Sequence, residues 1–164
     1  MGKSNLTVEE KNSYIGYMLN NEKLERIIQK CNMELPQDQV AVMSSILSRC
    51  VDGAGVIVAI DSDEIPVGVD NIELYTEITK YCKMHCAAKP DGTKYVMAFT
   101  SKDRFLDGLS GIVVPMDVFI GMICLKKEET NGVVINIKQE ELIINMSALE
   151  ILYNCIREWN PEPK

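Results

Sequence analysis

The stretch Gly-Val-Ile-Val-Ala-Ile at residues 55–60 marks the point where this sequence changes from helical to strand periodicity. Five consecutive apolar residues, 56–60, include four β-branched side chains, and such a run is typical of a strand buried on both faces. Before it, apolar residues recur at helical spacing; after it, short apolar runs alternate with turn signals. We therefore expect helices first, and then a sheet built around this strand.

The residues upstream of this strand predict three helical segments. Thr-Val-Glu-Glu at 7–10 matches a capping box, in which the Thr and Glu side chains satisfy free amides of the first turn. It opens a helical extension over residues 1–20. A stripe of apolar residues predicts a helix near 21–33, and Pro36, suited to a first helical position, opens another near 37–50.

Downstream, turn signals separate further strands and two more helices. Lys-Pro-Asp-Gly at 89–92 and Asn-Gly at 131–132 are turn sequences that favour antiparallel neighbours, whereas longer crossovers allow parallel ones. The expected strands are residues 56–60, 79–87, 94–99, 112–114, 133–137 and 142–144. The expected helices lie near 117–126 and 147–158.

Together these elements predict an α+β fold. We expect a mixed parallel and antiparallel sheet of about five or six strands, covered by helices, with N-terminal helices preceding the sheet. The length of 164 residues suits one domain, here 21–164, preceded by the extension 1–20. The expected core contains Ile57, Phe99, Val113, Val134, Ile135, Ile143 and Leu152.

Composition and charge restrict the partners and the compartment. The chain has 17 Lys and Arg against 24 Asp and Glu, a net charge of −7, so neither nucleic acid nor an anionic membrane surface is an expected partner. No apolar leader opens the sequence, and its apolar runs are far shorter than the roughly 18 residues of a membrane span. We expect a cytoplasmic protein with reduced cysteines, because no Cys-x-x-Cys pair occurs.

The sequence lacks the patterns of an enzyme. His85 is the only histidine, and no Gly-x-Ser-x-Gly motif marks a nucleophile for it to activate. Gly-Ala-Gly at 53–55 precedes a strand, whereas the glycines of a dinucleotide-binding motif follow one. We therefore expect no catalytic residues and no cofactor.

Cys82, His85 and Cys86 carry the residue types of a metal site. On a helix the three side chains share a face and converge, whereas on a strand Cys82 and Cys86 share one face and His85 points the other way. The β-branched and aromatic residues around 76–81 favour the strand. Binding of a small molecule or a metal ion through these three residues is the alternative to the protein-binding function considered next.

The acidic segment 61–71 is the candidate contact surface for a protein partner. It carries four acidic residues and no Lys or Arg, so repulsion between its charges favours exposure. Apolar side chains among carboxylates suit an anchor inside a charged rim; alternatively they pack onto the sheet and the carboxylates are solvated. The candidate contact residues are Asp61, Asp63, Glu64, Ile65 and Val67.

Several stretches resemble the N-terminal domain of the SseB family of bacterial cytoplasmic proteins. Asp-Gly-Thr-Lys-Tyr-Val-Met-Ala-Phe-Thr-Ser at 91–101 resembles its turn and strand ending in Ala-Phe-Thr-Ser, and Asn-Gly-Val-Val-Ile-Asn at 131–136 resembles a second strand motif. Residues 21–58 and 142–152 fit the flanking elements. Met97 and Ile137 stand where the family usually has Pro, and the chain has no room for the C-terminal domain of longer members.

The resemblance implies an α+β fold and a bacterial cytoplasmic protein, and it brings no established catalytic residues. The two motifs end in residues that suit strand ends, turns and caps, so we expect them to determine the fold. The function we expect is that of a non-enzymatic protein–protein interaction module, with a partner that the sequence does not name.

Overall fold

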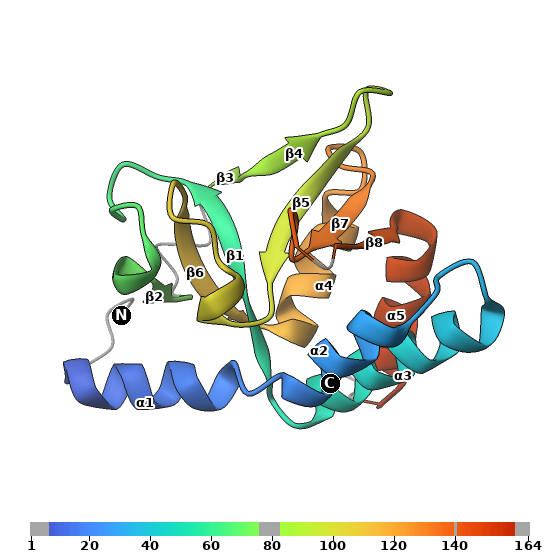
Figure 1. The fold of residues 1–164 in the computed structure, drawn as a ribbon, viewed down its shortest axis with the longest axis horizontal. Coiled ribbons are helices and arrows are strands. Elements are labelled where there is room, and N and C mark those ends of the chain that lie inside the picture. Colours follow the sequence, from blue (N-terminus) through green and yellow to red (C-terminus); the bar gives the residue numbers. More distant parts are fainter. Residues whose placement is uncertain (1–6, 76–82, 140, 160–164) are drawn as a thin grey trace.

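The computed structural model describes residues 7–75, 83–139 and 141–159 of the chain. Its helices are α1 (Val8–Met18), α2 (Glu22–Lys30), α3 (Pro36–Val51), α4 (Met116–Leu125) and α5 (Met146–Trp159) (Figure 1). Its strands are β1 (Gly55–Asp61), β2 (Glu73–Leu74), β3 (Lys83–Met84), β4 (Cys86–Ala88), β5 (Lys94–Phe99), β6 (Ser110–Pro115), β7 (Gly132–Ile135) and β8 (Leu142–Asn145). The predicted α+β class and mixed sheet are confirmed.

The strands form one sheet in the order β2-β6-β1-β5-β7-β8, with β3 paired to β1 and β4 paired to β5. β1 lies antiparallel to both β5 and β6, whereas β5 with β7 and β2 with β6 form parallel pairs. The sheet has eight strands within the described residues, more than the five or six expected. The two-residue β2 shows no periodicity of its own. The strand expected over 79–87 is described only from Lys83 onward, as the separate strands β3 and β4, and its earlier part lies outside the described residues.

β1 is buried on both of its faces, as its apolar run predicts. Val56 and Val58 pack with α2, α3, α4 and α5 on what we call the helical face. Ile57 and Ala59 pack on the opposite face, where α1 contributes Ile15 and Met18 and is followed by Leu19. The capping box expected at Thr7 and Glu10 is present at the start of α1. Within the described residues, no helix has the length and apolar character needed to cross a bilayer.

Six of the seven expected core residues are buried, and Ile143 is the exception. Its side chain is 38% exposed, because β8 is the last strand of the sheet and alternates its side chains between the two faces. Leu142 and Ile144 point into the helical face and are buried. The continuous apolar run in the sequence hides this alternation, so the prediction for Ile143 is wrong.

The two motifs that resemble SseB sequences meet where β5 and β7 end. The Thr100 amide donates to Asn136 Oδ1 at 3.1 Å, and Asn136 Nδ2 donates to Thr100 Oγ1 at 3.0 Å. The Thr100 hydroxyl also donates to the Glu25 carboxylate, and Asn21 Nδ2 donates to the Thr100 carbonyl at 2.9 Å. Thr100, Asn136 and Asn21 are all buried. This polar network ties α2 to both strand ends and gives each motif a structural role.

Candidate functional site

The candidate site lies where β1 and β5 separate and the β3–β4 segment fills the gap between them (Figure 1). β1 pairs with β5 at Ile57 and Val58 and with β3 near its end. The segment changes partner at His85, whose amide donates to the Ala59 carbonyl at 2.8 Å. The His85 carbonyl in turn accepts from the Met97 amide, which belongs to β5, at 3.3 Å. His85 is therefore the residue that joins the two diverging strands.

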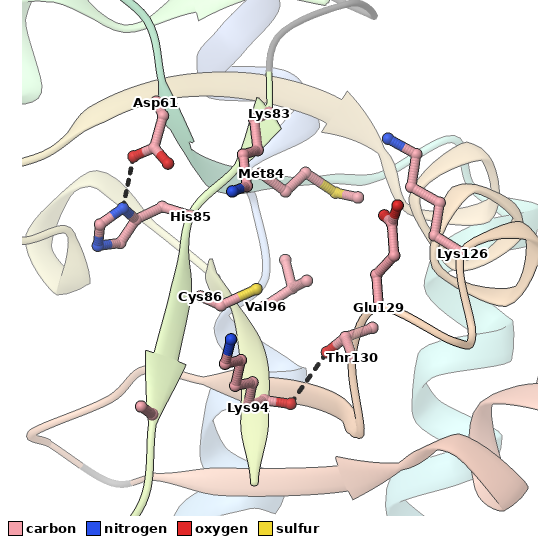
Figure 2. A pocket seen from close by; sticks show the side chains of 11 residues that line it. Asp61, Lys83, Met84, His85, Cys86, Lys94, Val96, Lys126, Glu129 and Thr130 are labelled. Carbon is pink, nitrogen blue, oxygen red and sulfur yellow. Dashed lines mark hydrogen bonds and ion pairs between the residues drawn. The ribbon is translucent and has the colours of Figure 1, made fainter. Parts of the chain in front are cut away.

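The strand register decides which side chains share a face. Met84 lies opposite Ile60 and Cys86 opposite Val96, so both side chains project onto the helical face. His85 lies between them and points to the other face, as predicted if this segment is a strand. Figure 2 shows Asp61 and His85 on one side of the segment and Met84 with Cys86 on the other.

The last residue of β1 meets the only histidine. Asp61 Oδ1 lies 2.6 Å from His85 Nδ1, and the two side chains are 52% and 40% exposed. These residues are 24 positions apart in the sequence, and each belongs to a different candidate site. The antiparallel pairing of β1 with β3 brings the two candidates together at one point.

On the face of this pair lies a hollow of about 390 Å³, which we call the acidic groove. Its walls are the loop after β1 and the residues before β6. The loop is held in place because Ser110 Oγ donates to the Ile65 carbonyl at 2.6 Å and the Gly68 amide donates to the Leu109 carbonyl at 2.9 Å. The side chains that define the groove are those of Asp61, Asp63, Val67, His85 and Leu109.

The acidic candidate contact residues are exposed, but the two apolar candidates differ in burial. Asp61, Asp63 and Glu64 are exposed. Val67 is 57% exposed, whereas Ile65 is only 7% exposed and belongs to the core on the helical face. Ile65 is therefore corrected from a contact residue to a core residue, because its side chain holds the loop down on the sheet. Val67 is thus the exposed one of the two apolar candidate residues.

On the helical face, a second hollow of about 570 Å³, which we call the lysine pocket, opens between β3, β4 and β5 and the turn after α4. Met84, Cys86 and Val96 form its floor (Figure 2). Among the described residues, four more with charged side chains border the pocket: Lys94, Lys126 and Glu129, and also Lys83, which lies opposite Asp61 in the strand register. Asp61 and His85 border both the pocket and the acidic groove.

The Cys86 thiol is not an activated nucleophile. Burial raises the pKa of this thiol, and the opposing effect of the ammonium groups of Lys94 and Lys83 is smaller. A thiol whose pKa is raised stays protonated near neutral pH, and the thiolate is the reactive form. Its histidine neighbour points to the opposite face, so the two do not form a nucleophile–base pair.

The part of the chain that the structure describes does not supply a set of ligands for the metal-binding alternative. His85 and Cys86 project to opposite faces of the sheet, and Cys82 lies outside the described residues. Among the described residues, no three His, Cys, Asp or Glu side chains are placed to hold a metal ion. A zinc site needs such convergence of three or four ligands.

Comparison with known proteins returned no matching family model, no similar curated protein and no similar solved structure. The SseB resemblance stays a prediction that rests on the two strand motifs. A fold class by itself does not imply a function, so the function is argued from the groove and the pocket.

Proposed function

We propose that this chain is a non-enzymatic protein-binding module that recognises a basic segment of a partner through the acidic groove. The observation that carries this proposal is Val67, an apolar residue that is 57% exposed and lines the same groove as Asp61 and Asp63. The bacterial origin and cytoplasmic location expected from the sequence belong to the same proposal.

The anchoring of the loop supports this role. A contact surface that is already ordered before binding loses less conformational entropy when the partner arrives. The loop after β1 is ordered by the buried Ile65 side chain and by two hydrogen bonds, from Ser110 Oγ and from the Gly68 amide. Its outward side chains therefore form a stable surface.

The charges of the loop indicate the chemistry of the partner. Within the described residues, no Lys or Arg forms an ion pair with Asp63, Glu64 or Asp70, and the ion-pair contact of Asp61 is with the His85 ring. These carboxylates keep their negative potential, which attracts a partner of opposite charge. Lys and Arg suit the groove because their aliphatic stems can cover Val67 and Leu109 while their charged ends meet the carboxylates.

A pull-down from bacterial extract with two matched triple variants tests the proposal. The groove variant carries Asp63→Asn, Glu64→Gln and Val67→Ser, and leaves Asp61 in its contact with His85. The control variant carries Glu150→Gln, Glu158→Gln and Ile151→Ser, which also removes two exposed carboxylates and one exposed apolar side chain. We expect wild type and control to retain a basic partner that high salt releases, and the groove variant to lose it. Equal capture by all three proteins refutes the groove as the contact surface.

A second candidate function is the binding of a small molecule in the lysine pocket. The volume of about 570 Å³ favours it, because small-molecule sites typically measure roughly 300–1,000 Å³. His85 and Cys86 of the sequence-based alternative both border this pocket. Titration with charged and neutral aromatic probes, followed by the amide NMR signals of the lining residues, tests this function; if no probe shifts them, it is refuted.

A further inference from the structure

We infer that the lysine pocket is a binding site for a small organic anion, one that carries a phosphate or carboxylate group on an apolar body. The inference rests on the second candidate function and names the class of its ligand. It uses the helical face of the β3–β4 segment, whereas the acidic groove uses the other face. Among the described residues, the two sites share Asp61 and His85 at their border.

The first argument is the charge around the pocket. Lys83, Lys94 and Lys126 border it, and within the described residues none of the three forms an ion pair. This is notable in a chain with 24 acidic and 17 basic residues, where carboxylates outnumber their partners. Among the described residues, the carboxylates that border the pocket belong to Glu129 and to Asp61, and Asp61 already contacts His85. The pocket therefore has an excess of positive charge that an anion can neutralise.

The second argument is that the backbone under one lysine is fixed. The Lys94 carbonyl accepts from Thr130 Oγ1 at 3.0 Å and from the Asn131 amide at 2.8 Å. The Lys94 amide donates to Asn131 Oδ1 at 2.9 Å. These three bonds tie the start of β5 to the turn before β7, and Figure 2 shows the Thr130 contact beside the Lys94 side chain. The distance between two walls of the pocket is thereby set before a ligand enters.

The third argument is the apolar floor. Met84 and Val96 are 8% and 2% exposed, and together with the half-buried Cys86 they lie between Lys83 and Lys94 in Figure 2. Binding sites for organic ligands combine such an apolar lining with a few charged groups that orient the ligand. An inorganic anion alone leaves this floor uncovered. An anion with an apolar body meets both the ammonium groups and the floor.

A titration with three related probes tests the inference. Phenyl phosphate carries both the charge and the apolar body, inorganic phosphate carries the charge alone, and phenol carries the ring alone. We expect phenyl phosphate to bind most tightly and to shift the amide NMR signals of residues 83–88, 94–96 and 126–130. Its affinity should fall as salt is added, because screening weakens attraction between partly exposed charges.

Charge variants provide the matched controls. Lys94→Gln and Lys126→Gln should each weaken phenyl phosphate binding about fivefold, the effect of losing one charge near 4 Å in water. Lys127→Gln removes the same charge from the neighbouring residue, which does not border the pocket, and should change little. Glu129→Gln removes a repulsive carboxylate and should strengthen binding.

Three outcomes overturn the inference. In the first, phenyl phosphate does not shift the NMR signals of the pocket residues. In the second, Lys127→Gln weakens phenyl phosphate binding as much as Lys126→Gln does. The third is phenol that binds as tightly as phenyl phosphate, which refutes the anionic ligand but leaves small-molecule binding standing. Failure of all three probes refutes both.

Discussion

Replacing Thr100 with Val tests the polar network that joins the two strand motifs. Val has nearly the shape of Thr but lacks the hydroxyl. The change removes the hydrogen bond to the Glu25 carboxylate and leaves Asn136 Nδ2 without its acceptor at 3.0 Å. The backbone bonds of Thr100, to Asn136 Oδ1 and from Asn21 Nδ2, remain.

The expected loss follows from the burial of these groups. An unsatisfied buried donor costs about 1–3 kcal/mol, and a hydrogen bond to a charged group contributes about 1.5–3 kcal/mol. The Glu25 side chain is 17% exposed, so water can replace part of its lost contact and the lower values apply. We therefore expect Thr100→Val to lower the free energy of unfolding by about 2–4 kcal/mol.

Urea unfolding followed by circular dichroism measures this change, with Thr93→Val as the matched control. The Thr93 hydroxyl also donates to a carboxylate, that of Asp91 at 2.6 Å, but this pair lies on an exposed turn. Water can take its place there, so the control should change stability far less. If Thr100→Val is no more destabilising than Thr93→Val, the network does not hold the strand ends together.

Further predictions concern the glycines, the core and a buried thiol. A Cβ on Gly132 would lie 2.2 Å from the Ile144 carbonyl oxygen, so Gly132→Ala should lower the free energy of unfolding by about 3 kcal/mol or more. A Cβ on Gly16, inside α1, would have no neighbouring atom within 4 Å, so Gly16→Ala should raise the free energy of unfolding by about 0.5–1 kcal/mol. Equal effects of the two glycine substitutions would contradict the close approach of β7 to β8 at Gly132. Leu152→Ala, at a side chain 1% exposed, should cost about 2–5 kcal/mol in a thermal melt. The adjacent Ile151→Ala, at a side chain 63% exposed, serves as control and should change little. Burial raises the pKa of the Cys50 thiol from 9.0 to about 12, so the unfolded chain loses this proton first and stability should fall as pH rises through this interval. Cys50→Val should flatten that pH dependence in urea titrations, and an unchanged slope would assign it to other groups.

The parts of the fold that sequence reasoning found are those with a local signal. The run at 56–60 predicts β1 because its β-branched residues are contiguous, and Pro36 predicts the start of α3 because proline suits that position. β2 has only two residues and exists through its parallel pairing with β6, so no local pattern marks it. Ile143 is misplaced because whether a strand lies at the edge of a sheet is a property of the topology.

The sequence predicted only the part of the candidate site that has a local signal. The exposure of Asp61 and Asp63 follows from their charge, but the contact of Asp61 with His85 depends on the register between β1 and β3. The lysine pocket draws Lys83, Lys94 and Lys126 from three separate segments. No spacing in the sequence links these three residues, so only the fold brings them together.

The central place of β1 has a consequence for the order of events during synthesis. Its last residue, Asp61, leaves the ribosome before any strand with which it pairs in the described sheet, and β6 is complete only at Pro115. At about 5–20 residues per second, that interval lasts roughly 3–11 s, during which the edge of this apolar strand that pairs with β6 lacks its complete partner. The segments already made by then include α1, which places Met18 against Gly55, and α2 with α3, which pack on the helical face. Synthesis thus supplies a helix for each face of this strand before either of its edges finds a neighbour.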